Sequence, residues 1–144
     1  MHPIDRRHIL SGVPSSLVAV GGTSASPAAG LTLHVLDTRS GKPAAGVRVE
    51  LSVLENGVYR PLRQVHTNAE GRNQEMLLDS SEMKTGKYQL IFHVGAYFKA
   101  RDPSLAEPLF LEQAVIQFGI SDPLSHYHIP LLASPWSFTT YRGS

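Results

Sequence analysis

The sequence predicts an all-β protein folded as a sandwich of sheets. Apolar and polar residues alternate with a period of two in several short segments, which is the pattern of strands buried on one face. Residues that favour turns separate these segments, and only one short stretch favours a helix. A chain of 144 residues with ordinary apolar content can form one domain with a substantial core.

The expected strands follow this alternation along the chain. They cover residues 31–36, 47–53, 88–94, 114–118 and 127–131, and the run 136–140 also strongly favours a strand. The turns between them are expected at residues 40–43, 55–57, 69–71 and 85–86. A short helix is expected from Ala96 to Arg101, and it must end before Pro103 because proline lacks an amide hydrogen and its ring obstructs the helix.

The overall composition excludes several classes of function. The formal net charge of +1 gives no bias towards nucleic acid or an anionic membrane surface, so neither is expected as a partner. The chain contains no cysteine, which excludes disulfides, thiolate catalysis and cysteine-based zinc sites. No apolar stretch is long enough to span a bilayer.

The first 29 residues differ from the rest of the chain. Arg6 and Arg7 precede a mildly apolar run at 9–20 and then small residues, which is the order of an export signal. The arginine pair resembles the twin-arginine pattern, although Asp5 and Pro14 depart from it. We therefore expect residues 1–29 to be an export signal to the periplasm, with a disordered tail on a cytoplasmic protein as the alternative, and residues 30–144 to form the domain.

The period of two also assigns polar side chains to faces. If Leu33 and Val35 point into the core, His34 points away from it, and the same argument places His126 and His128 on an outer face. On the last strand, Tyr141 also falls on an outer position. Imidazoles beside apolar residues suit a groove closed by a second subunit. Periodicity alone does not establish that the strands carrying these residues are neighbours.

Two other interpretations of these histidines remain. A single histidine on an outer face is most often an ordinary surface residue. His126 and His128 also have the spacing of metal ligands, but a catalytic metal normally needs a third ligand, and the nearby Asp122 sits in a turn. We therefore expect no metal.

A series of short motifs extends over the whole domain. They are Leu33-His34-Val35-Leu36-Asp37, Ser40-Gly41-Lys42-Pro43-Ala44, Thr67-Asn68-Ala69-Glu70-Gly71-Arg72, Gly95-Ala96-Tyr97-Phe98, His126-Tyr127-His128-Ile129-Pro130-Leu131-Leu132, Ser134-Pro135 and Tyr141-Arg142-Gly143-Ser144. With these motifs the chain from about residue 31 to its end resembles the 5-hydroxyisourate hydrolases, the transthyretin-related enzymes of urate breakdown. It departs from their pattern at Glu70, where aspartate is usual, and at 110–113 and 136–138.

The resemblance implies a transthyretin-like sandwich of two four-stranded sheets and a homotetramer with active sites in the channel where dimers meet. The family's catalytic histidine pair falls on His34 and His128, and its arginine falls on Arg72. These residues, together with Tyr141 and Ser144, are expected to bind the substrate. Fold alone does not separate an enzyme from a carrier, but transthyretin lacks the histidine and arginine set.

The resemblance implies hydrolysis of 5-hydroxyisourate to 2-oxo-4-hydroxy-4-carboxy-5-ureidoimidazoline, without metal or organic cofactor. A neutral imidazole suits removal of a proton from water, and this role falls to His34 or His128. Arg72 would hold the substrate oxygens and stabilise developing negative charge. The alternatives are a non-catalytic carrier of small aromatic ligands, as in transthyretin, and a plain structural β-sandwich.

Overall fold

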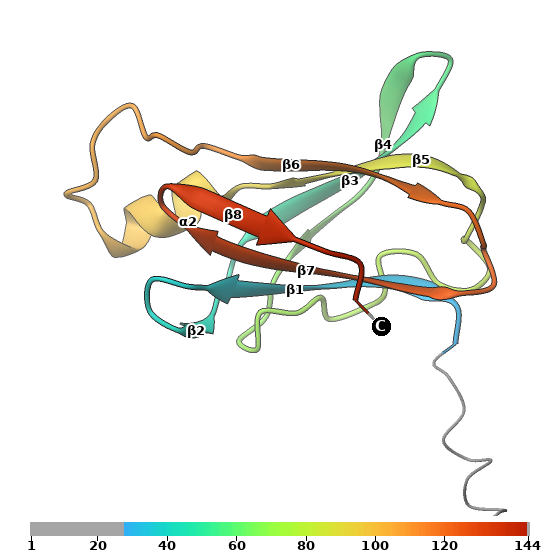
Figure 1. Cartoon of the computed structure of the whole chain (residues 1–144), viewed down its shortest axis with the longest axis horizontal. Coiled ribbons are helices and arrows are strands. Elements are labelled where there is room, and N and C mark those ends of the chain that lie inside the picture. Colours follow the sequence, from blue (N-terminus) through green and yellow to red (C-terminus); the bar gives the residue numbers. More distant parts are fainter. Residues whose placement is uncertain (1–27, 144) are drawn as a thin grey trace, which may run out of the picture.

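The computed structural model describes residues 28–143, which form two four-stranded sheets that face each other (Figure 1). One sheet has the strand order β2-β1-β7-β8, and the other has the order β4-β3-β5-β6. The strands are β1 (Gly30–Asp37), β2 (Lys42–Pro43), β3 (Arg48–Glu55), β4 (Val58–His66), β5 (Gly86–Phe92), β6 (Ala114–Ile120), β7 (His126–Ser134) and β8 (Ser137–Thr140). The expected all-β sandwich of two four-stranded sheets is confirmed.

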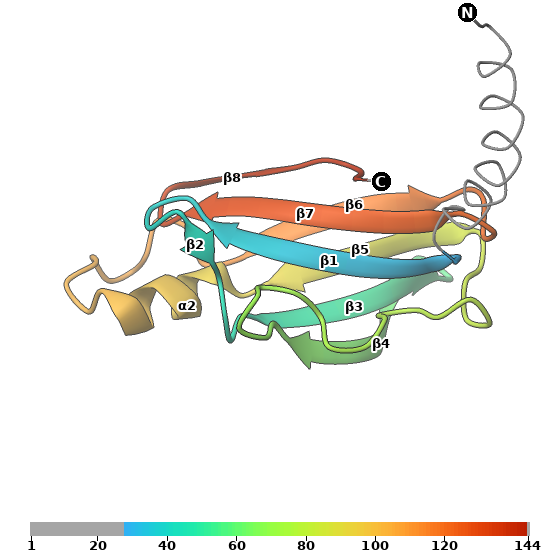
Figure 2. The same ribbon diagram turned by 90° about the horizontal axis from the view of Figure 1, so that it is seen from below.

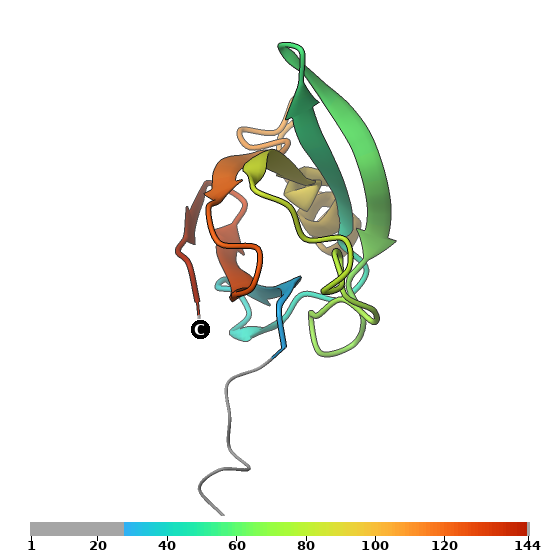
Figure 3. The same ribbon diagram turned by 90° about the vertical axis from the view of Figure 1, so that its right-hand side faces the viewer.

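The core lies between the two sheets, which are seen opposite each other from one end in Figure 3. Leu33 and Val35 of β1 are fully buried between the sheets, and so are Leu51 of β3 and Leu90 of β5 on the opposite sheet. Along β1 and β5 the buried residues alternate with partly exposed neighbours, as the sequence periodicity predicts, whereas in β3 the alternation ends at Leu51, because Ser52 is also buried and Val53 is only partly buried. The outer faces are therefore set by the same alternation.

The strands β1 and β7 form the centre of the first sheet, and they run parallel to each other. All the other strand pairs are antiparallel. The parallel register places Thr32 opposite His128 and His34 opposite Pro130. Residues far apart in the sequence thus become neighbours on one outer face.

One helix, α2 (Val94–Arg101), lies at one end of the described structure (Figure 2). It begins two residues before the expected position at Ala96 and ends at the expected residue. At 8 residues it is short, and no helix among residues 28–143 is long and apolar enough to cross a membrane. The helix is tied to β1 because the Tyr97 hydroxyl donates a hydrogen bond of 2.9 Å to the Asp37 carboxylate. Burial, with Asp37 beside it, raises the pKa of Tyr97 to about 12.

Two strands were not expected from the sequence. Strand β4 is largely exposed, so its side chains do not alternate between core and solvent, and it contains Pro61. Proline is tolerated there because β4 is an edge strand, and Leu62 beside it is the extra residue of a bulge opposite the step from Leu51 to Ser52. Strand β2 has only 2 residues within the expected turn. Both strands lack the burial pattern on which sequence periodicity depends.

Candidate active site

Histidines from the two central strands meet on the outer face of the first sheet. His34 belongs to β1, while His126 and His128 belong to β7; all three are partly buried, and His34 and His128 each lie between buried neighbours. Because β1 and β7 are paired in parallel, the outward positions of one strand lie beside those of the other. The structure therefore brings together two histidines that were expected to act as a pair, His34 and His128.

Arg72 reaches this face from the loop that follows β4. Its backbone forms an isolated antiparallel bridge with His34, next to a hydrogen bond of 2.8 Å from the Val35 amide to the Gly71 carbonyl. Gly71 has φ +75°, and a Cβ at this position would lie 2.4 Å from the Val35 carbonyl oxygen. Only glycine allows so close an approach of the two backbones, and this approach places Arg72 beside His34.

The turn that presents Arg72 is held by Asn68. The Asn68 side-chain oxygen accepts hydrogen bonds from the amides of Glu70 at 3.0 Å and Arg72 at 2.9 Å. The Asn68 amide in turn donates to the Arg72 carbonyl at 2.8 Å. These bonds involve the backbone of Glu70 and not its side chain, so the glutamate in place of the usual aspartate is compatible with the position of Arg72.

Arg72 and the two histidines of β7 border an open recess of about 370 Å³, whereas His34 is not among its lining residues; the size suits a small molecule. It is lined by Thr32, Leu33, Arg72, Asn73, His126 and His128. Asn73 is held in place because its side-chain oxygen accepts a hydrogen bond of 2.9 Å from the Leu33 amide. The sequence interpretation did not identify Asn73 or Thr32 as site residues. Thr32 could have been found, since it lies two residues before His34 on the same face.

The Thr32 hydroxyl lies within hydrogen-bond distance of two imidazoles. Its oxygen is 2.7 Å from Nδ1 of His128 and 3.1 Å from Nε2 of His126. The two imidazole rings are nearly parallel, with 13° between their planes and 6.3 Å between their centroids. Thr32 therefore links the histidines of β7 into one hydrogen-bonded group.

Both members of the expected catalytic pair have pKa values below their ordinary value. For His34, burial is the largest cause, the charge of Arg72 lowers the pKa further, and a hydrogen-bonding interaction with the backbone of Glu70 opposes both. For His128, burial again dominates, followed by the charges of Arg72, His126 and His34. Both imidazoles are thus neutral near pH 7, the state in which a histidine can accept a proton.

The chain end runs alongside His128. The Gly143 amide donates a hydrogen bond of 2.6 Å to the His128 carbonyl, and a Cβ at Gly143 would lie 3.0 Å from Cδ2 of the His128 ring. Tyr141, by contrast, lies beside a separate recess that Ile116 and Phe118 of β6 also line. Ser144 lies outside the described residues. Substrate contacts of Tyr141 and Ser144 therefore stay predictions.

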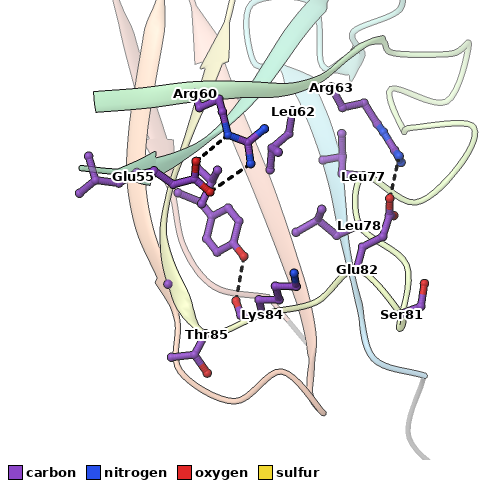
Figure 4. A pocket seen from close by; sticks show the side chains of 14 residues that line it. Glu55, Arg60, Leu62, Arg63, Leu77, Leu78, Ser81, Glu82, Lys84 and Thr85 are labelled. Atoms are coloured by element: carbon purple, nitrogen blue, oxygen red, sulfur yellow. Dashed lines mark hydrogen bonds and ion pairs between the residues drawn. The ribbon is translucent and has the colours of Figure 1, made fainter. Parts of the chain in front are cut away.

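A larger recess of about 490 Å³ lies between β4 and the loop before β5 (Figure 4). Its arginines are engaged in ion pairs, Arg60 with Glu55 at 2.6 Å and Arg63 with Glu82 at 3.0 Å. Figure 4 shows each arginine pointing to its glutamate partner. Size alone does not identify an active site, and the smaller recess is the one where imidazoles and the guanidinium of Arg72 meet.

The fold and the recess define a transthyretin-like β-sandwich that carries a histidine and arginine site on an outer sheet face. The chain matches the "HIUase/Transthyretin family" over residues 31–143, and it belongs to that family.

Relatives and solved structures agree with this assignment. The chain is 47% identical to "5-hydroxyisourate hydrolase 2" of Rhizobium meliloti, in an alignment that covers 79% of this chain and 95% of the relative. A solved 5-hydroxyisourate hydrolase of Klebsiella pneumoniae is 37% identical, with a TM-score of 0.64 and coverage of 79% of this chain and 98% of that one.

Other proteins share the fold. A solved transthyretin of Sparus aurata is 25% identical, with a TM-score of 0.69 and coverage of 78% of this chain and 95% of that one. A solved (S)-allantoin synthase is 38% identical with a TM-score of 0.75, and the match covers 83% of this chain but only 45% of the synthase.

Proposed function

We propose that this protein hydrolyses 5-hydroxyisourate to 2-oxo-4-hydroxy-4-carboxy-5-ureidoimidazoline in urate breakdown. The observation that carries the proposal is a recess of the outer sheet face that Arg72 and His128 line, with His34 joined to Arg72 by a backbone bridge. The relative of Rhizobium meliloti, which bears the name of this activity, supports it over nearly its whole length.

The reaction opens a cyclic amide by attack of water. One neutral imidazole accepts a proton from the water while its oxygen bonds to the carbonyl carbon, a contribution of about 10²–10⁴-fold. The carbon–nitrogen bond then breaks, and the leaving nitrogen takes up a proton. The second imidazole orients the water or donates towards the substrate.

Arg72 supplies positive charge where negative charge develops. Its guanidinium has a planar set of donors that suits two substrate oxygens at once. A fixed donor of this kind is typically worth about 10²–10³-fold in rate. Burial is the larger cause of the lowered pKa of both histidines, and the charge of Arg72 lowers it further, which favours their neutral forms.

The test is a coupled assay on the full chain. Uricase generates fresh 5-hydroxyisourate, and its ultraviolet decay is followed with and without the protein. We expect decay well above the spontaneous rate, and we expect His128→Asn to abolish the acceleration. Retention of the substrate by folded protein without turnover would instead support a carrier of the transthyretin type.

We also propose that the protein assembles as a homotetramer with this recess closed by a second subunit. The strands β6 and β8 are sheet edges, and exposed aromatic residues lie on or beside β8, namely Trp136 and Phe138. Uncovered edges and apolar side chains favour pairing with another copy. Light scattering during size-exclusion chromatography should give four times the 15.7 kDa chain mass, and a monomer at assay concentration would refute the assembly.

The role of residues 1–29 in the location of the protein is a proposal, because residues 1–27 lie outside the described structure. We propose that they direct export of the folded protein, supported by Arg6 and Arg7 ahead of the apolar run. Fusing these residues to a reporter should place it in the periplasm, and replacing both arginines by lysine should retain it in the cytoplasm. A reporter that stays cytoplasmic in both cases would favour the alternative location.

A further inference from the structure

We propose that Thr32 and His126 are positioning residues that hold His128 in the tautomer with its proton on Nε2. The proposal rests on the proposed hydrolysis and decides which histidine accepts the proton from water. His128 then acts as a neutral hydrogen-bond donor to the substrate carbonyl, and His34 is the base.

The geometry that carries the proposal is a short chain of hydrogen bonds. Thr32 lies opposite His128 on paired parallel strands, and His126 lies two residues before His128 on the same face. The Thr32 oxygen is 2.7 Å from Nδ1 of His128 and 3.1 Å from Nε2 of His126. A hydroxyl has one proton to donate, so Thr32 donates to one imidazole and accepts from the other.

The buried ring nitrogen of His126 determines in which direction the hydrogen bonds through Thr32 run. Nδ1 of His126 is buried, and among the described residues it has no hydrogen-bond partner. A buried N–H without an acceptor is rarer in proteins than a buried acceptor without a donor. Nδ1 of His126 therefore carries the lone pair and Nε2 carries the proton, which it donates to Thr32.

The remaining protons follow from that choice. Thr32 accepts from His126, so its own proton points to Nδ1 of His128. Nδ1 of His128 is then unprotonated, and its Nε2 carries the hydrogen of the neutral imidazole. His128 can donate a hydrogen bond to the recess from Nε2, but it has no free lone pair with which to accept a proton there.

The base is then His34. His34 is the other histidine of the expected pair, and its backbone bridges to that of Arg72. Because His128 acts as a donor, an unprotonated ring nitrogen of His34 takes a proton from water as the new carbon–oxygen bond forms, and returns that proton to the leaving nitrogen. His34 thus ends the reaction with the same protons with which it began. Arg72 and the Nε2–H of His128 stabilise the negative charge that develops on the carbonyl oxygen.

The primary test measures the tautomer without substrate. The full chain is labelled with ¹⁵N-histidine, and long-range ¹H–¹⁵N correlations identify which ring nitrogens carry a proton. The signals of His128 are assigned, among the seven histidines of the chain, from their loss in His128→Asn. We expect a protonated Nε2 and an unprotonated Nδ1 in the wild type, and the reverse assignment would overturn the proposal.

Two matched pairs of variants test the positioning role. Thr32→Val removes the hydroxyl at nearly constant shape, and His126→Phe removes the donor to it, so each should give a mixture of His128 tautomers. Each should also lower kcat about 10- to 100-fold. Thr32→Ser and His126→Gln keep the hydroxyl and the donor, and they should retain both the tautomer and most of the activity.

A control separates this role from a general effect on folding. The Thr38 hydroxyl also bonds across the sheet, to the Ala133 carbonyl at 3.0 Å, but it lies outside the recess. Thr38→Val should therefore leave kcat and the His128 tautomer unchanged. An unchanged tautomer and kcat in Thr32→Val would refute the positioning role. Absence of turnover in the wild type would refute the proposed hydrolysis, while the tautomer measurement would still stand.

Discussion

Replacement of Gly71 by alanine should damage both the stability and the activity of the protein. Gly71 has φ +75°, and an added Cβ would lie 2.4 Å from the Val35 carbonyl oxygen, a backbone atom. The loop must therefore move away from β1, which breaks the hydrogen bond from the Val35 amide to the Gly71 carbonyl. Arg72 moves with it, because it is the next residue in the chain.

The size of the effect can be compared with that of a matched glycine. Gly57 has φ +79°, but a Cβ there meets nothing within 4 Å. Gly57→Ala should cost only the left-handed conformation, about 1–2 kcal/mol. Gly71→Ala should add about 1–3 kcal/mol for leaving the buried Val35 amide without an acceptor. For a domain of this size, each kcal/mol lowers Tm by about 4 °C.

The assay combines thermal unfolding with the uricase-coupled decay of 5-hydroxyisourate, measured at a temperature where both variants are folded. We expect Gly71→Ala to lower Tm by several degrees more than Gly57→Ala. Its kcat/KM should fall about 10²-fold or more because the oxygen-binding charge is displaced, while Gly57→Ala should keep kcat/KM within about twofold of wild type. Equal losses in the two variants would refute the argument that contact between Gly71 and β1 places Arg72.

Three further predictions concern the recess. We expect a fall in kcat/KM of about 10²–10⁴-fold, with little change in Tm, for each of three variants: His34→Asn, His128→Asn and Arg72→Lys. The control His66→Asn, at an exposed position, should keep normal activity. Normal turnover in any of the three test variants would remove that residue from the mechanism. The pH profile of kcat/KM should decline on the acid side with an apparent pKa below 6.5, since burial and the arginine lower the pKa of both imidazoles. These histidines bind protons at higher pH in the unfolded chain than in the folded protein, so the free energy of unfolding should also fall as pH decreases through 6.5. An acid limb of the activity profile above 6.5 would contradict this prediction. Gly143→Ala should reduce kcat several-fold by pushing on the His128 ring, 3.0 Å from the added Cβ, and crystal structures of both forms would show whether the ring moves.

The sequence predicted the strands that have one buried face, and with them the outward position of the histidines. Alternation identifies such strands because each side chain points to the face opposite that of its neighbour. It does not identify β4, since neither face of that exposed edge strand is consistently buried. The positive-φ turns also escaped the alternation, but glycine in the motif before Arg72 was a visible signal of one of them.

The expected site was only partly brought together. The structure places Arg72 and His128 on one recess, with His34 bridged to Arg72, whereas Tyr141 lies beside β6 and a different recess. Nothing in the local sequence shows that Tyr141 lies beside β6 once β8 has ended at Thr140. The direction of the chain beyond a strand depends on packing against the rest of the molecule.

By itself the sequence determined the class of fold, the inward and outward faces and the residue types available for hydrolysis, because these follow from local periodicity and side-chain chemistry. Only the tertiary structure decided which of these residues are neighbours. The parallel register of β1 and β7 places Thr32 between the histidines of β7, and the close approach at Gly71 brings in Arg72. Both contacts join segments that are distant in sequence, so their geometry is set by the packing of the whole sandwich.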